Sequence, residues 1–226
     1  MMDFDTLKAR GLFDQRLPRY TSYPPAPAFH DGIGADFQAK ALAALDPDEP
    51  ISLYLHIPFC ERLCWFCACR TQGVSSLAPV QHYIATLEAE LAVVAKHLKG
   101  KQRIKQMHWG GGTPTILPPE LIKRLVTAID GVFQRDENTE FSVEIDPTLV
   151  DADKITALRA AGMSRASIGV QDFATQVQES IGRLQSYEQT KTAVDLLRGA
   201  GIASLNIDLV YGLPFQSVEG FGRTLD

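Results

Sequence analysis

The sequence predicts an α/β protein built on a parallel sheet, and two observations lead to this fold class. From Ile51 onward, short apolar strands alternate with amphipathic helices, and the strand–helix unit recurs five times. Each predicted strand ends at glycine, proline or polar residues, and parallel strands bring such ends to one edge of a sheet. We therefore predict a parallel, partial TIM-like barrel with only about five strands in this chain.

The expected elements follow from apolar periodicity. Strands are predicted at 53–57, 104–109, 141–145, 166–170 and 204–210. Helices are predicted at 79–98, 119–133, 151–161 and 187–199, with the start of another at 217–226. A closed (β/α)8 barrel needs about 250 residues. Because the 226 residues stop inside a predicted helix, we expect a fragment of a longer protein.

The first fifty residues lack this alternation. Short helices are expected at 4–12 and 35–45, and residues 19–24 are expected to be extended because residues before proline avoid the helical region. We therefore divide the chain into an N-terminal arm that covers the substrate, residues 1–50, and a partial barrel, residues 51–226.

Composition excludes several classes of function. The net charge of −5 gives no electrostatic reason to expect nucleic acid or an anionic membrane as partner. No run approaches the roughly 20 apolar residues of a membrane span, and the N-terminus lacks the apolar core of a signal peptide. We expect a cytoplasmic protein, since thiols persist in that compartment.

All four cysteines lie directly after the first strand. Cys60, Cys64 and Cys67 have the spacing Cys-x3-Cys-x2-Cys, and Cys69 follows two residues later. One short loop can wrap three thiolates around a [4Fe–4S] cluster, which leaves one iron free to bind a small molecule. The spacing favours such a cluster. A structural disulfide, a zinc site and merely buried thiols are the alternatives, although no second pair of zinc ligands is present.

Later strands also end in residues suited to ligand binding. Gly110–Pro114 follows the second strand, and glycine lets a ligand approach the backbone closely. Glu144 ends the third strand, where a carboxylate can accept hydrogen bonds from a ribose diol. Asp208 lies in an apolar strand, so we expect its charge to be paired with Arg183 or with a ligand.

Six motifs together carry a more specific resemblance. In chain order they are Pro18–Pro24, His56–Cys69, Trp109–Thr115, Val143–Pro147, Gly169–Phe173 and Asp208–Pro214. They resemble the oxygen-independent coproporphyrinogen III oxidase (coproporphyrinogen dehydrogenase) family of the radical S-adenosylmethionine (SAM, AdoMet) superfamily. The resemblance covers essentially the whole chain and implies a (β/α)6-type radical SAM barrel. That family's chain is about twice as long, with a C-terminal domain that is absent here.

The resemblance implies an enzyme of heme biosynthesis. It implies that two propionates of coproporphyrinogen III are oxidatively decarboxylated to vinyl groups by a 5′-deoxyadenosyl radical. The implied cofactors are a [4Fe–4S] cluster and two molecules of AdoMet, and an unidentified electron donor and acceptor complete the reaction. We expect a monomer. A related heme-chaperone branch and an inactive fragment are the alternatives.

The resemblance also assigns residues. The implied cluster ligands are Cys60, Cys64 and Cys67, whereas Cys69 is not expected to be a ligand. The implied contacts to the cluster-bound AdoMet are Tyr54, Gly111 and Glu144. Those to the second AdoMet are Phe66, Gly112, Thr113, Gln171, Arg183 and Asp208. His56 is implied to be needed for catalysis, together with Tyr54.

Overall fold

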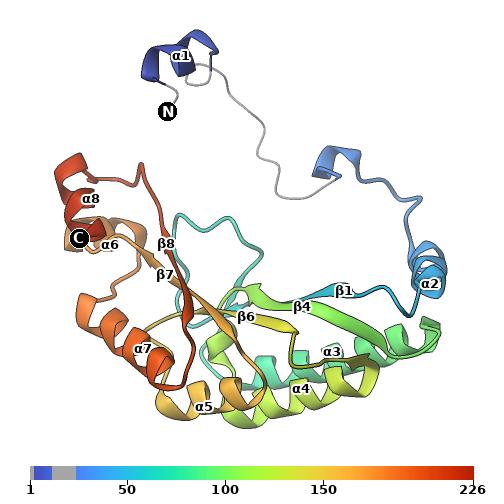
Figure 1. Cartoon of the computed structure of the whole chain (residues 1–226). Coiled ribbons are helices and arrows are strands. Elements are labelled where there is room, and N and C mark those ends of the chain that lie inside the picture. Colours follow the sequence, from blue (N-terminus) through green and yellow to red (C-terminus); the bar gives the residue numbers. More distant parts are fainter. Residues whose placement is uncertain (1–2, 12–23) are drawn as a thin grey trace. The chain divides into compact units, whose positions relative to one another are not determined.

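The computed structural model describes residues 3–11 and 24–226, and two compact units divide the chain at residues 41 and 42 (Figure 1). The first unit contains α1 (Phe4–Ala9), the 3-10 helix η1 (Ala26–Ala28) and most of α2 (Ala35–Ala44). Asp3 caps α1 by accepting a hydrogen bond from the Thr6 backbone. The extended segment expected at 19–24 falls almost wholly outside the described residues.

The second unit is built on a parallel sheet, as the sequence predicts. Its five main strands are β1 (Ile51–Ile57), β4 (Gln102–Gly111), β6 (Glu140–Ile145), β7 (Arg165–Gln171) and β8 (Ser204–Leu209). They pair side by side in chain order, all parallel, and the two-residue β5 (Phe133–Gln134) adds to β4. β1 and β8 are the two ends of this order, so the sheet is an open, partial TIM-like barrel.

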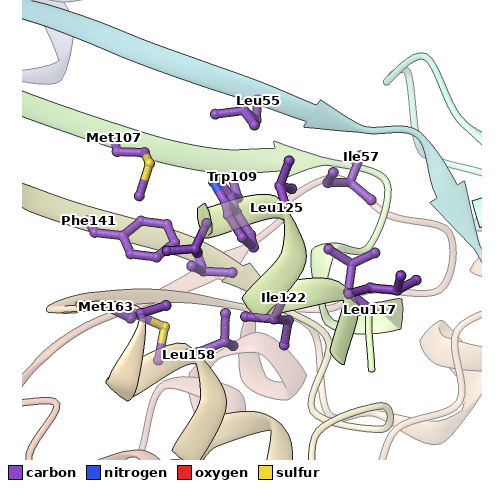
Figure 2. Packing of buried hydrophobic residues seen from close by; sticks show 14 of the residues in the cluster. Leu55, Ile57, Met107, Trp109, Leu117, Ile122, Leu125, Phe141, Leu158 and Met163 are labelled. Carbon is purple, nitrogen blue, oxygen red and sulfur yellow. The ribbon is translucent and has the colours of Figure 1, made fainter. Parts of the chain in front are cut away.

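Four helices cover one face of this sheet. They are α3 (Ala78–His97), α4 (Pro119–Val132), α5 (Ala152–Ala160) and α7 (Tyr187–Gly199), and they lie together along one side of the strands in Figure 1. Alternate strand residues point toward them and form the core, which includes Leu55, Ile57, Met107, Trp109 and Phe141 (Figure 2). Burial of this apolar layer against the helices is the main source of stability.

The remaining strand positions form the opposite, polar face. Because side chains alternate along a strand, these residues point away from the four helices. They are Ser52, Tyr54, His56, Gln106, His108, Ser142, Glu144, Ser167, Asn206 and Asp208, and every one is exposed or only partly buried. An uncovered polar face beside a solid apolar core leaves room for a polar ligand.

Several short elements escape the sequence prediction. The chain pairs again directly after Pro58, through β2 (Phe59–Cys60) and β3 (Gln72–Gly73), which form their own small ladder. The 3-10 helix η2 (Pro114–Ile116) and α6 (Thr175–Ile181) are too short to show a helical period. α8 (Val218–Leu225) occupies the helix expected at 217–226. Within residues 3–11 and 24–226, no helix is long and apolar enough to cross a membrane.

Candidate functional site

The cysteine-rich loop is closed at its base by the β2–β3 ladder. The Gln72 backbone N–H donates to the Pro58 carbonyl at 2.7 Å, and the Val74 N–H donates to the Cys60 carbonyl at 2.9 Å. The loop between these strands carries the other three cysteines, and all four thiols are free. Cys60 is buried, whereas Cys67 and Cys69 are exposed. The loop is therefore held at both ends by a short parallel ladder, with its thiols available for ligation.

The far side of this loop is attached to the connection between α6 and α7. The Trp65 N–H donates to the Ile181 carbonyl at 3.0 Å, and Arg62 Nη1 donates to the Leu184 carbonyl at 2.9 Å. Gly182 ends α6 in the left-handed conformation, with a φ of 69° that favours glycine. Arg183 follows this turn and reaches the loop, where its Nη1 lies 3.8 Å from Cys64 Sγ.

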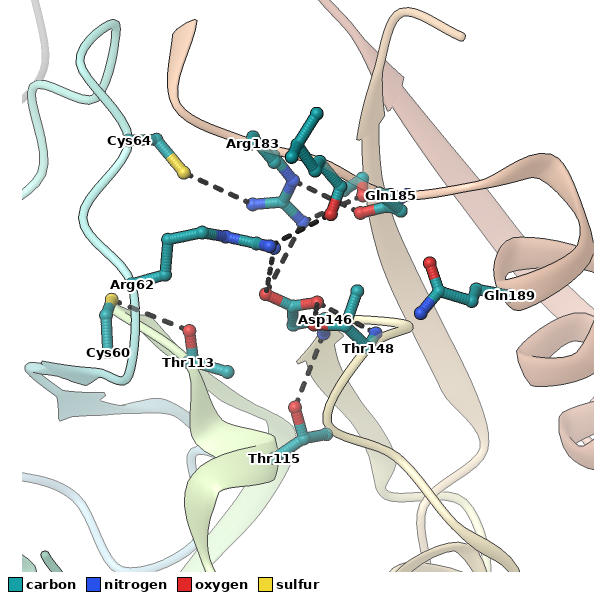
Figure 3. Close-up of polar contacts among 12 residues, drawn as sticks. Cys60, Arg62, Cys64, Thr113, Thr115, Asp146, Thr148, Arg183, Gln185 and Gln189 are labelled. Atoms are coloured by element: carbon teal, nitrogen blue, oxygen red, sulfur yellow. Dashed lines mark hydrogen bonds and ion pairs between the residues drawn. The ribbon is translucent and has the colours of Figure 1, made fainter. Parts of the chain in front are cut away.

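Two arginines converge on one carboxylate beside the cysteines (Figure 3). Arg62 Nη2 and Arg183 Nη2 lie 3.7 Å and 3.8 Å from the Asp146 carboxylate, which is largely buried. The other carboxylate oxygen accepts hydrogen bonds from the backbone and hydroxyl of Thr148. Two cations against one anion leave this wall of the site able to accept a further negative charge.

Glu144 is held from two sides at the end of β6. One carboxylate oxygen accepts the Gly111 backbone N–H at 3.0 Å, and the other lies 3.4 Å from His108 Nε2. The Ser142 hydroxyl lies 2.6 Å from the other ring nitrogen of His108. The Tyr54 ring stacks on the His108 ring with centroids 5.7 Å apart. The carboxylate therefore has a defined orientation.

Two glycines allow these close approaches. A Cβ at Gly110 would lie 2.7 Å from Glu144 Oε1 and 2.8 Å from His108 Nε2. A Cβ at Gly112 would lie 2.7 Å from the Phe59 carbonyl oxygen. A side chain at Gly112 would push two backbone segments apart, and one at Gly110 would displace the Glu144 and His108 side chains.

β7 and β8 supply the opposite wall, where one of the two partners expected for Asp208 is not found. Gln171 ends β7 with a φ of 72°, at a register shift against β8, and such strained positions gather at functional sites. Asp208 is not paired with Arg183: it accepts hydrogen bonds from Ser167 Oγ at 2.8 Å and Asn206 Nδ2 at 2.7 Å. Asp208 lies on the polar, exposed face of β8, so its charge is not buried.

The structure raises the pKa of three titratable groups in or beside the site. Burial raises the pKa of the Cys60 thiol, and the Thr113 hydrogen bond acts against this increase. Burial, followed by the proximity of Cys67, raises the pKa of Cys69 to about 11. Burial, with the charge of Glu144, raises the pKa of Tyr54. All three groups are thus protonated at neutral pH.

One cavity of about 230 Å³ gathers eleven of the thirteen residues singled out from the sequence. Its lining includes Cys60, Cys64, Phe66, Cys67, Gly111, Gly112, Thr113, Glu144, Gln171, Arg183 and Asp208. Tyr54 and His56 are not in that lining. The His56 ring accepts from the Tyr54 hydroxyl at 3.0 Å and donates to the Arg70 carbonyl at 2.8 Å, which fixes its tautomer. The Tyr54 ring stacks on His108, which in turn contacts Glu144 in the cavity wall.

The sequence alone did not identify His108, Arg62 or Asp146 as parts of the site. His108 could have been found from strand parity, because it lies opposite Tyr54 in the β1–β4 register and opposite Ser142 in the β4–β6 register. Asp146 lies within the motif Val143–Pro147, but the sequence assigned it no role of its own. Arg62 gave no signal, since its partners are more than eighty residues away in the sequence.

Comparison with known proteins assigns the chain to a class. The model of the radical SAM superfamily matches residues 54–226, so the chain belongs to this superfamily.

Among its relatives is an oxygen-independent coproporphyrinogen III oxidase from Cereibacter sphaeroides, 58% identical over the whole chain and over 50% of the relative. The corresponding Escherichia coli protein is 41% identical, covering 92% of this chain and 45% of the relative. The solved structure of the E. coli enzyme, described as a radical SAM enzyme, matches with a TM-score of 0.85 and 40% identity. That match covers 91% of this chain and 47% of the other. The chain therefore spans about half the length of the relatives it matches.

The donor set fits the [4Fe–4S] cluster and AdoMet that this superfamily implies. Four free thiols line or adjoin one cavity whose other walls carry a fixed carboxylate and two arginines. In the part of the chain that the structure describes, no three metal-binding side chains are already drawn together around one point. The pinned ends of the loop leave its central thiols free to close around a cluster.

Proposed function

We propose that this chain forms the cluster- and AdoMet-binding part of an oxygen-independent coproporphyrinogen III oxidase. The reaction is the oxidative decarboxylation of two propionates of coproporphyrinogen III to vinyl groups, which gives protoporphyrinogen IX. One observation carries the proposal: eleven residues from six separate stretches of sequence line a single cavity at the carboxyl ends of the strands. The names and identities of the relatives support the choice of substrate.

In this proposal, Cys60, Cys64 and Cys67 hold the cluster and Cys69 does not. When bound, the cluster supplies the electron that cleaves AdoMet to methionine and a 5′-deoxyadenosyl radical, which removes a hydrogen atom from the propionate. Glu144, already oriented by Gly111 and His108, accepts hydrogen bonds from the bound AdoMet. Arg183 is assigned to the second AdoMet, to whose carboxylate it would offer a cation.

The other wall of the cavity would bind a second AdoMet. Gln171 and Asp208 come from adjacent strands and both line the cavity, as do Phe66, Gly112 and Thr113. His56 has a fixed tautomer and, with Tyr54, faces the uncovered polar side of the sheet. We place the catalytic pair there, where a large tetrapyrrole can approach, and residues 1–50 as an arm that covers it.

The proposal includes partners and compartment. An external one-electron donor reduces the cluster, and an acceptor takes the electron left after carbon dioxide departs. The protein acts as a monomer in the cytoplasm, where free thiols such as these four persist.

Anaerobic reconstitution tests this function. We expect a brown chain with four iron and four sulfide atoms per molecule, which forms 5′-deoxyadenosine from AdoMet with dithionite. Cys60→Ser is the matched control and should hold no cluster. A colourless chain with stoichiometric zinc contradicts the cluster. A loaded chain that binds heme tightly, with no decarboxylation even when joined to a relative's C-terminal half, contradicts the reaction.

A further inference from the structure

The Thr113 side chain points into the cysteine loop and contacts a sulfur atom. Thr113 Oγ1 donates to Cys60 Sγ at 3.5 Å, and both side chains are buried (Figure 3). The resemblance assigns Thr113 only to AdoMet, yet its hydroxyl is directed at a predicted cluster ligand. A hydroxyl has a single proton to donate. In this contact the hydroxyl proton of Thr113 is directed at Cys60 Sγ.

The backbone fixes this contact. The Thr113 N–H donates to the Phe59 carbonyl at 2.8 Å, and the Gly112 N–H donates to the Ile57 carbonyl at 2.8 Å. Cys60 directly follows Phe59, and its own carbonyl accepts from Val74. Backbone hydrogen bonds therefore fix the segment that carries Thr113 against the segment that carries Cys60. The hydroxyl is in place before any cluster binds.

A second cysteine has the same arrangement. Arg183 Nη1 lies 3.8 Å from Cys64 Sγ. The backbone N–H of the next residue, Trp65, donates a hydrogen bond to the Ile181 carbonyl at 3.0 Å. Again a donor from outside the loop faces a sulfur, and a backbone hydrogen bond next to that cysteine holds the pair together. Hydrogen bonds to the sulfurs are one of the features that set an iron–sulfur cluster's potential.

We propose that Thr113 is a positioning residue that sets the reduction potential of the cluster by donating a hydrogen bond to Cys60 Sγ. The inference rests on the proposed function, because it requires the cluster. The physical reason is electrostatic: the reduced cluster carries one more negative charge, and a donor stabilises that charge on sulfur. The hydroxyl therefore makes reduction by the external donor easier. Arg183 makes the corresponding contact at Cys64.

The test compares four chains after anaerobic reconstitution: wild type, Thr113→Val, Thr113→Ser and Thr115→Val. Valine keeps the shape of threonine but removes the donor, and serine keeps the donor. Thr115 is also buried, two residues away, but its hydroxyl contacts the Asp146 backbone at 3.3 Å instead of a sulfur. Cluster potentials are measured by redox titration monitored by electron paramagnetic resonance, without AdoMet.

We expect a more negative potential in Thr113→Val, and wild-type potentials in Thr113→Ser and Thr115→Val. Resonance Raman spectra should show an Fe–S(Cys) stretch at higher frequency in Thr113→Val alone, because the lost hydrogen bond strengthens the iron–sulfur bond. An unchanged potential in loaded Thr113→Val overturns the inference, as does an equal shift in Thr115→Val.

If Thr113→Val takes up no cluster, Thr113→Ala removes the same donor with a smaller side chain. Failure of both to load, while Thr113→Ser loads, overturns a role in potential and assigns the hydroxyl to assembly. A wild-type chain that binds no cluster overturns the proposed function, and this inference with it. If the wild-type chain cleaves AdoMet but Thr113→Val has the wild-type reduction potential, the inference is overturned and the proposed function stands.

Discussion

Gly112 is the position where the smallest change should have the largest effect. A Cβ there would lie 2.7 Å from the Phe59 carbonyl oxygen, 2.8 Å from the Pro58 carbonyl carbon and 2.9 Å from the Phe59 nitrogen. These are backbone atoms, which cannot rotate away as a flexible side chain can. Gly112→Ala must therefore push the segment after β4 away from the segment that leads into the cysteine loop.

The magnitude follows from what this movement strains. Overpacking a rigid site by one methyl group costs about 1–3 kcal/mol. The displacement also stretches the hydrogen bonds from Gly112 and Thr113 to Ile57 and Phe59, each with a net contribution of about 1 kcal/mol. A total of roughly 3 kcal/mol corresponds to a melting temperature about 6–12 °C lower for a chain of this size.

Gly131→Ala is the matched control for this prediction. Gly131 lies exposed near the end of α4, and a Cβ there meets nothing within 4 Å. Alanine is the better helix former by about 0.5–1 kcal/mol, so this variant should melt slightly higher than wild type. Thermal unfolding followed by circular dichroism measures both. Equal melting temperatures for Gly112→Ala and wild type would refute the reasoning.

Three further predictions concern single side chains. Serine in place of any one cluster ligand should abolish iron binding, whereas Cys69→Ser should keep four iron atoms; loss of iron from Cys69→Ser contradicts this division. The three ligands are Cys60, Cys64 and Cys67. His108→Phe keeps the ring but loses the contact to Glu144, so AdoMet affinity by calorimetry should fall about tenfold; unchanged affinity contradicts it. Burial raises the pKa of Tyr83 in the folded state, so its contribution to stability is complete below about pH 10 and is lost as the pH rises above it. Tyr83→Phe should lose less stability than wild type between pH 9 and 11 in urea titrations, and an identical loss contradicts it.

The strands could be predicted because their apolar faces repeat with period two, and all five main strands begin and end within two residues of expectation. The cysteine spacing likewise depends only on local sequence. Arg62 and Asp146 could not be predicted as a pair, because only the fold brings the loop after β2 to the end of β6. The expected pair of Asp208 with Arg183 does not form for a related reason: the sequence shows an apolar strand, but does not show which of its faces is left uncovered.

The segment Gly110–Thr113 connects the two halves of the proposed site. Gly110 leaves room for Glu144 and Gly111 donates to it. Gly112 and Thr113 hold the base of the cysteine loop, and Thr113 contacts Cys60. A disturbance at Gly112 should therefore affect iron binding and AdoMet binding together, whereas His108→Phe should affect AdoMet binding alone. Coupling of this kind needs no movement through the protein, because one short stretch of backbone contacts both the carboxylate and the sulfur. The glycines are thus required by two neighbours at once, which explains why the segment has so little side-chain bulk.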